Sequence, residues 1–77
     1  MNEIENNIYK ILKKVFRKSK IPKKINNLKI NDLEEWDSLG NFNLLLAIED
    51  YYKIRFSLDE ISKIKNINEI LDYLKKK

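Results

Sequence analysis

Hydrophobic positions near the start of the chain recur with helical spacing. Over residues 3–18, apolar residues fall three or four positions apart, while lysines and an arginine occupy many of the positions between them. This period places the apolar side chains on one face of a helix. We therefore predict a first helix over residues 3–18, whose buried face consists of Ile4, Ile8, Ile11, Leu12, Val15 and Phe16.

The next segment, residues 19–37, shows no sustained period. It contains the only proline, Pro22, and apolar residues at irregular intervals. Either a long loop held against the core or a loop with a short helical turn fits this pattern. A connection of this length is unusual in a compact domain and often accompanies function.

A second helical pattern begins at Ser38 and ends near Tyr52 or Ile54. A Ser or Asp at the N-cap accepts a hydrogen bond from an orphaned backbone N–H, and we assign this role to Ser38. At about 100° per residue the helix has two unlike faces. The first is an ordinary core face, made of Leu44, Leu45, Ile48 and Tyr52. The opposite face places leucines among polar residues and comprises Leu39, Asn43, Leu46 and Asp50.

Two cap signals precede the remaining helices. Ser57 and Glu60 form the S-x-x-E pattern of a capping box ahead of a short helix, about residues 58–64. Asn66 and Glu69 repeat a similar signal before a closing helix with apolar residues at the i, i+3, i+4 and i+7 positions. No strand-like alternation is long enough to predict a sheet. The fold class is therefore all-α: a small bundle of three main helices and one short helix, with a long loop between the first two.

The composition narrows the range of functions. At 77 residues the chain is too short for two cores, so we predict a single domain over residues 1–77. Cysteine and histidine are both absent, which removes the usual zinc sites, thiol nucleophiles and imidazole bases. A core this small also leaves little stability for an elaborate active site. We expect a binding or carrier protein, not an enzyme, and no metal site.

The sequence also carries expectations about location. No stretch approaches the run of about 18 apolar residues typical of a membrane span, and Met1 leads into a charged helical pattern instead of the apolar core of an export signal. We therefore expect a cytoplasmic protein that does not insert into membranes.

Charge is unevenly distributed along this basic chain. The net charge is +4, yet residues 31–60 hold eight acidic and two basic residues. The Lys-rich first helix makes a small nucleic-acid-binding domain an alternative. However, no helix combines basic residues with base-reading side chains on one exposed face, and no aromatic residues alternate with the lysines. We therefore expect no nucleic-acid partner. A second alternative is an unmodified adaptor that binds another protein through the second helix.

Residues 37–74, "DSLGNFNLLLAIEDYYKIRFSLDEISKIKNINEILDYL", resemble an acyl carrier protein without a gap. The D-S-L signature, the "AIED" run and the closing "DYL" occur in the family's order. The first helix and the long loop agree with the family in layout more than in residues. The resemblance implies an acyl-carrier-like helical bundle.

The resemblance implies that Ser38 carries 4′-phosphopantetheine, transferred from coenzyme A by a phosphopantetheinyl transferase, and that Asp37 supports the transfer. A phosphodiester at a helix N-terminus meets the positive end of the helix dipole. An acyl or aminoacyl group is then held as a thioester, loaded by a ligase and presented to acyl-processing enzymes of fatty acid or secondary metabolite biosynthesis. The protein itself is expected to be a non-catalytic monomer.

Two further groups of residues follow from the same resemblance. Partner enzymes are expected to dock on the second helix at Leu39, Asn43, Leu46, Glu49 and Asp50. A sheltered acyl chain is expected to lie against Ile48, Ile61, Ile64 and Ile70. If they serve no partner, Asp37, Glu49 and Asp50 form an ordinary solvated face, on which Glu49 and Lys53 make an i, i+4 pair.

Several residues depart from a housekeeping fatty-acid carrier. Trp36 precedes Ser38 by two positions, Gly40 replaces an acid, and Ile61 and Ile70 replace small residues, which should shrink an acyl cavity. These differences favour a specialised carrier with a short acyl or aminoacyl cargo. We expect Trp36 to fold over the core rather than to stack on a ligand.

Overall fold

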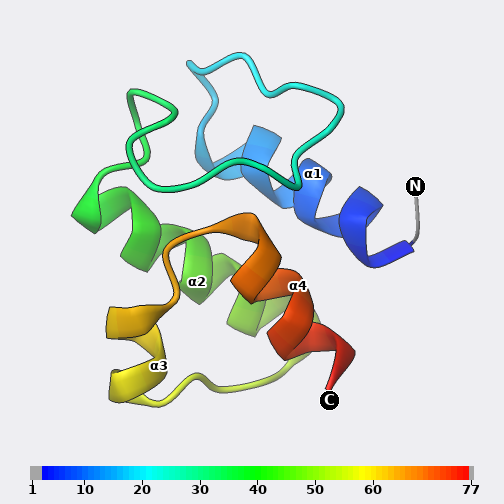
Figure 1. Cartoon of the computed structure of the whole chain (residues 1–77), viewed down its shortest axis with the longest axis vertical. Helices are drawn as coiled ribbons and strands as arrows, with labels where there is room; N and C mark the ends of the chain where they lie inside the picture. Colours follow the sequence, from blue (N-terminus) through cyan, green and yellow to red (C-terminus); the bar gives the residue numbers. More distant parts are fainter. Residues whose placement is uncertain (1–2, 77) are drawn as a thin grey trace.

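The computed structural model describes residues 3–76, which form four helices and no strand. These are α1 (Glu3–Val15), α2 (Ser38–Tyr52), α3 (Leu58–Lys63) and α4 (Ile67–Lys75). Figure 1 shows α1, α2 and α4 around a common centre, with α3 and its flanking connections beside α2. The predicted all-α bundle of three main helices and one short helix is confirmed.

The first helix ends at Val15, three residues before the predicted end. Phe16 still donates its N–H to the Leu12 carbonyl at 2.8 Å, but its ring is buried in the core. Beyond it the chain turns, and the Lys18 N–H and the Ser19 hydroxyl both donate to Oε1 of Glu35, at 2.9 and 3.0 Å. The two ends of the long loop are therefore tied to each other, and this tie turns the chain away from the axis of α1.

The core lies where α1, α2 and α4 face one another. The predicted core face of α2 is confirmed, since Leu44, Leu45 and Ile48 are buried and Tyr52 is half-buried. Ile8 and Leu12 of α1 and Ile67 and Ile70 of α4 are also completely buried. The largest fully buried side chain is Trp36, which comes from the loop instead of a helix.

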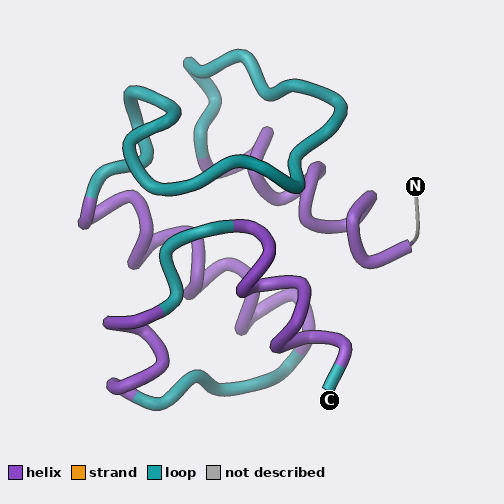
Figure 2. Tube along the Cα trace, in the orientation of Figure 1, coloured by secondary structure: helices purple, strands orange, loops and turns teal. Residues whose placement is uncertain are grey.

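The long connection between α1 and α2 contains turns but no helix (Figure 2). Ile25 is fully buried beneath it, and four other apolar loop residues pack partly on the core. A single antiparallel bridge joins the loop to the start of α4: the Ile30 N–H donates to the Lys65 carbonyl at 2.8 Å, and the Ile67 N–H to the Leu28 carbonyl at 2.9 Å. The predicted long loop, held against the core, is confirmed.

The two predicted caps form as expected. Ser57 Oγ accepts from the Glu60 N–H at 3.1 Å, and Glu60 Oε1 accepts from the Ser57 N–H at 2.8 Å, which completes the capping box of α3. Asn66 Oδ1 accepts from the Glu69 N–H at 2.8 Å and caps α4. The capping box begins a short helix whose last residue is Lys63, one residue before the predicted end.

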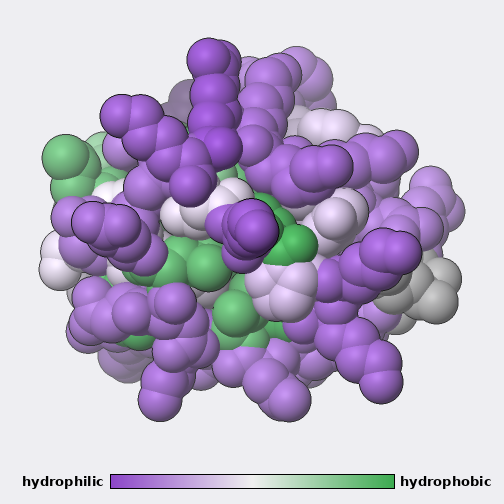
Figure 3. All heavy atoms as spheres, turned by 90° about the horizontal axis from the view of Figure 1, so that it is seen from above, coloured by the Kyte–Doolittle hydropathy of each residue, from purple (hydrophilic) through white to green (hydrophobic). Residues whose placement is uncertain are grey.

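The surface is strongly polar on the side of the long loop. Figure 3 shows this face as mainly hydrophilic, with small apolar areas between the polar side chains. The end of α1 and the first part of the loop contribute a cluster of exposed cations, namely Lys13, Lys14, Arg17, Lys18, Lys20, Lys23 and Lys24. None of the helices in residues 3–76 combines the length and the apolarity that crossing a bilayer requires.

Candidate functional site

Ser38 is the first residue of α2, and its side chain is exposed. The prediction that Ser38 caps the helix is wrong, because Asp37 takes that position. Asp37 has an extended backbone (φ −98°, ψ −165°), and its Oδ1 accepts from the Gly40 N–H at 2.7 Å. The cap sits one residue earlier than predicted, and the Ser38 hydroxyl has no hydrogen-bond partner among residues 3–76.

Trp36 connects the residues before Ser38 to the rest of the bundle. Its ring is completely buried and stacks on Phe16, with ring centroids 5.9 Å apart. Its Nε1 donates to Asn41 Oδ1 at 2.9 Å, and Asn41 Nδ2 donates to the Ile64 carbonyl at 2.8 Å. The expectation that Trp36 folds over the core is confirmed. We call the chain from Trp36 through Asn41 to Ile64 the indole relay.

Gly40 allows the loop to cross the first turn of α2. A Cβ at this position would lie 2.1 Å from the backbone oxygen of Glu35 and 3.2 Å from the Phe16 ring. Backbone cannot move aside as a flexible side chain can, so only glycine fits this crossing. Gly40 and Asn41, which sequence reasoning left without a role, therefore both hold the loop that carries Asp37 and Ser38.

The outward face of α2 exposes the predicted leucines, and it also exposes an aromatic residue, Phe42. Leu39 is 68% exposed and Leu46 is 41% exposed. Phe42, also 42% exposed, was not predicted to be functional; its position four residues after Ser38 is the sequence signal that places both on one side of the helix. Asn43 and Asp50 are exposed on the predicted face.

Glu49 differs from the other predicted docking residues because its carboxylate is used within the fold. It is only partly exposed, and its Oε2 accepts from the Phe56 N–H at 2.6 Å. This bond, in place of the expected pairing with Lys53, anchors the connection from α2 to α3. The reason is local: Lys53 ends α2 in a left-handed conformation (φ 58°), which turns the chain back so that Phe56 reaches Glu49.

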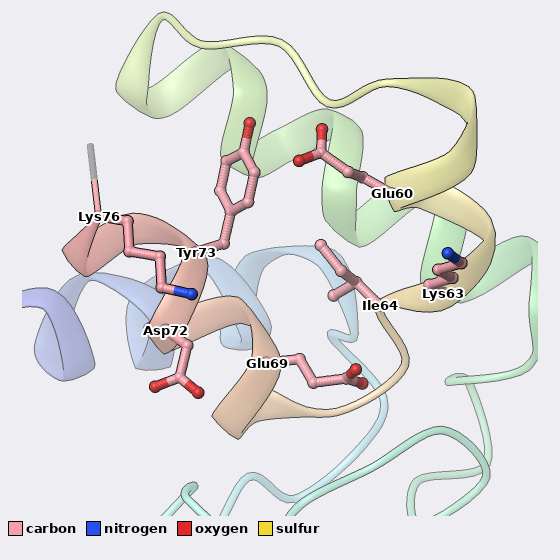
Figure 4. Close-up of a pocket in the computed structure, with 7 residues that line it drawn as sticks. All are labelled: Glu60, Lys63, Ile64, Glu69, Asp72, Tyr73 and Lys76. Atoms are coloured by element: carbon pink, nitrogen blue, oxygen red, sulfur yellow. The ribbon is translucent and has the colours of Figure 1, made fainter.

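Two pockets lie on either side of α3. One, of about 340 Å³, opens beside Ser38, and we call it the Ser38 pocket; it is lined by Ile30, Ser38, Asn41, Phe42, Ile61, Ser62 and Lys65. The other, of about 530 Å³, lies between α3 and α4 (Figure 4). This α3–α4 pocket is lined by Glu60, Lys63, Ile64, Glu69, Asp72, Tyr73 and Lys76.

The four residues predicted to shelter an acyl chain do not share one of these pockets. Ile61 lines the Ser38 pocket, and Ile64 lines the α3–α4 pocket. Ile48 and Ile70 are completely buried in the core and line neither. In addition, residues 3–76 contain no group of three acidic side chains placed to hold a metal ion.

A small helical domain with an unengaged serine hydroxyl at the start of a helix is suited to carrying a covalently attached group. Comparison with curated proteins agrees with this class. The chain is 32% identical over 77 residues to the acyl carrier protein of Buchnera aphidicola subsp. Schizaphis graminum, an alignment that covers all of this chain and 96% of that protein. The chain therefore belongs to the acyl carrier protein family.

Two shorter alignments point to the same family. The acyl carrier protein of Syntrophus aciditrophicus is 44% identical over 46 residues, covering 60% of this chain and 56% of that protein. The acyl carrier protein of Phytoplasma mali is 36% identical over 53 residues, covering 64% of this chain and 63% of that protein. No family model and no solved structure matches the chain.

Membership of this family assigns the general function. The protein is a carrier of acyl groups and a substrate of other enzymes, and it is not itself an enzyme. Neither alternative, a nucleic-acid-binding domain or an unmodified adaptor, is favoured by these relatives.

Proposed function

We propose that Ser38 Oγ carries 4′-phosphopantetheine and that this arm holds the cargo. The observation that carries the proposal is the exposed, unengaged hydroxyl of Ser38 at the first position of α2. The backbone N–H groups of Ser38 and Leu39 also have no acceptor among the described residues. A phosphodiester fits such a helix start, because it meets free N–H donors and the positive end of the helix dipole.

The arm ends in a thiol, and this thiol supplies the thioester linkage that a cysteine-free chain lacks. Asp37 supports the transfer of the arm. One of its carboxylate oxygens caps α2, while the other has no hydrogen bond within residues 3–76. That second oxygen is free to face the transferase, where a metal ion that holds the phosphates of coenzyme A also takes carboxylate oxygen ligands.

The attachment is tested by incubating the protein with coenzyme A and a broad-specificity phosphopantetheinyl transferase, followed by intact mass spectrometry. We expect one added phosphopantetheine on the parent protein and none on Ser38→Ala. The matched control is Ser62→Ala, because Ser62 is exposed and lines the same pocket. An unmodified parent would contradict the proposal, and full modification of Ser38→Ala would move the site elsewhere.

The outward face of α2 is the proposed docking surface for the transferase, the loading ligase and acyl-processing enzymes. Its exposed leucines supply a small apolar contact, and its charged rim supplies orientation. The rim is mixed in sign: Asp50 lies beside Lys14 on one side and beside Lys53 and Arg55 on the other. The proposed docking residues are Leu39, Asn43, Leu46, Glu49 and Asp50.

Docking is tested with Leu39→Ala and Leu46→Ala. We expect a lower kcat/KM for modification by the transferase with little change in melting temperature, because Leu39 is 68% and Leu46 41% exposed and neither is part of the buried core. Leu45→Ala is the contrasting control, since Leu45 is buried and its truncation costs about 2–5 kcal/mol of stability. Unchanged kcat/KM in both exposed variants would remove this face from the proposal.

The cargo is proposed to be a short acyl or aminoacyl group. Ile48 and Ile70 are completely buried in the core and line neither pocket beside α3, and both of these pockets are open to solvent. A short cargo needs no enclosed cavity, whereas a long alkyl chain gains from one. The measurement is hydroxylamine cleavage of loaded thioesters: equal rates for acetyl and octanoyl cargo are expected, and strong protection of the octanoyl thioester would contradict the proposal.

Three further expectations accompany this function. Residues 1–77 are proposed to form one domain, the protein to be monomeric, and its location to be the cytoplasm, where coenzyme A is available for the transfer. Light scattering after size-exclusion chromatography tests the monomer, and a single unfolding transition tests the single domain. Cell fractionation tests the location. A dimer mass, a biphasic transition or a membrane-bound fraction would contradict the respective expectation.

A further inference from the structure

The Ser38 pocket joins three separate segments of the chain. Ile30 comes from the long loop, Ser38 and Phe42 from α2, and Ile61 and Lys65 from α3 and the connection after it. Its volume of about 340 Å³ falls near the lower end of ligand pockets, which commonly span about 300–1,000 Å³. The pocket is therefore large enough for part of a small ligand, and Ser38, the proposed attachment residue, is part of its lining.

Hydrogen bonds hold the three segments together around this pocket. Asn41 Nδ2 joins α2 to the Ile64 carbonyl at 2.8 Å, and the Ile30 N–H joins the loop to the Lys65 carbonyl at 2.8 Å. The Lys65 N–H in turn donates to Glu69 Oε1 at 3.2 Å. The backbone that carries Lys65 is thus held from both sides. A pocket whose walls are already ordered loses little conformational entropy when a ligand enters.

The lining of the pocket has one charge and an apolar side. Lys65 is exposed, and its ammonium group has no ion-pair partner within residues 3–76. By contrast, the neighbouring Lys63 pairs with Asp59 at 3.1 Å and lines the α3–α4 pocket. A lysine ammonium is a compact point charge that binds phosphate well.

The arm proposed for Ser38 has a matching order of groups. Its phosphodiester is bonded to the serine, a branched dimethyl group comes next, and two amides and the thiol follow. Lys65 is complementary to the first of these groups. The apolar side chains of Ile30, Phe42 and Ile61 are complementary to the second. Phe42 is 42% exposed without the arm, so contact with a dimethyl group would remove apolar surface from water.

We propose that the Ser38 pocket seats the first part of the arm: Lys65 Nζ pairs with the phosphodiester, and Ile30, Phe42 and Ile61 contact the dimethyl group. The proposal rests on the attachment at Ser38. The amides and the thiol extend beyond the pocket, so the cargo stays accessible while the phosphate end is held. Lys65 is a positioning residue for the arm, and the ion pair is weakened by salt because the pocket is open to solvent.

The test uses phosphorus-31 NMR of the modified protein. The parent, Lys65→Ala and the matched control Lys63→Ala are compared while the ionic strength is raised from about 0.01 M to about 1 M, over which the Debye length falls from about 30 Å to about 3 Å. At low salt, we expect the phosphodiester resonances of the parent and of Lys63→Ala to coincide and that of Lys65→Ala to differ from them. As the salt concentration rises, the first two resonances should move towards the position of Lys65→Ala. Nuclear Overhauser contacts from the dimethyl protons to Phe42 and Ile61 are expected in the parent.

The outcomes separate the two proposals. Intact mass is measured first on every sample, and a parent without the added group overturns the attachment at Ser38 together with the seating that rests on it. With the group present, a phosphorus resonance that Lys65→Ala leaves unchanged, or that Lys63→Ala changes equally, overturns the role of Lys65. Absence of dimethyl contacts to Phe42 and Ile61 overturns the apolar half. In both of the latter cases the carrier function stands.

Discussion

The indole relay predicts that Asn41 is a stability determinant despite being a polar residue on a helix. Asn41→Ala removes both hydrogen bonds of the side chain, at 2.9 Å to the Trp36 indole and at 2.8 Å to the Ile64 carbonyl. Trp36 is fully buried and Ile64 nearly so, so water does not easily replace the missing partner. The variant leaves a buried donor and a buried acceptor unpaired.

The size of the effect follows from these two groups. A buried polar group left without a partner costs about 1–3 kcal/mol, so the two groups together lower the free energy of unfolding of Asn41→Ala by about 2–6 kcal/mol. A domain of this length has a total of about 4–12 kcal/mol. The melting temperature falls by about 4–8 °C for each kcal/mol in small domains, which predicts a loss of roughly 8 °C or more.

Urea unfolding followed by fluorescence measures this loss, because Trp36 is the only tryptophan. Asn43→Ala is the matched control: Asn43 lies two residues further along α2 and is exposed, so its change should stay within about 0.5 kcal/mol. Trp36→Phe, alone and combined with Asn41→Ala, completes a double-mutant cycle with an expected coupling of about 0.5–3 kcal/mol. Equal stabilities of Asn41→Ala and Asn43→Ala would refute the reasoning.

Substitutions at Gly40 and Asp37 distinguish effects on stability from effects on the modification of Ser38. Gly40→Ala should destabilise the protein by about 1–3 kcal/mol, because the added Cβ would approach the Glu35 backbone too closely. Helix propensity alone predicts the opposite, since alanine is the better helix former by about 1 kcal/mol. A raised melting temperature in a thermal scan would therefore contradict the close approach. Asp37→Ala should lose about 0.5–2 kcal/mol of capping energy, whereas Asp37→Asn should keep it. Both Asp37 variants should nevertheless slow the modification of Ser38 in the mass assay, and an unimpaired Asp37→Asn would limit Asp37 to its capping role.

The helices and most of their caps are readable in the linear pattern because they depend on residues three or four positions apart. The buried face of α2 follows from the spacing of Leu44, Leu45 and Ile48, and the capping box follows from Ser57 and Glu60. Such interactions form within one turn of helix, so the local order of residues is enough to place them. The same local pattern leaves Leu39 and Leu46 on the outer face.

The surroundings of Ser38 depend on contacts that no local pattern contains. Trp36, Asn41 and Ile64 meet across 28 positions, and Ile30 reaches Lys65 across 35. These contacts form only when the long loop closes over α2 and α4, and nothing in the spacing of loop residues specifies which backbone groups then meet. The bond from Asn41 to the Ile64 carbonyl explains why a polar residue of α2 is buried. The path of the loop also places the Glu35 backbone and the Phe16 ring against Gly40, where only glycine fits. The N-cap likewise falls on Asp37 instead of Ser38 at the point where the loop, tied through Glu35 and Trp36, enters α2.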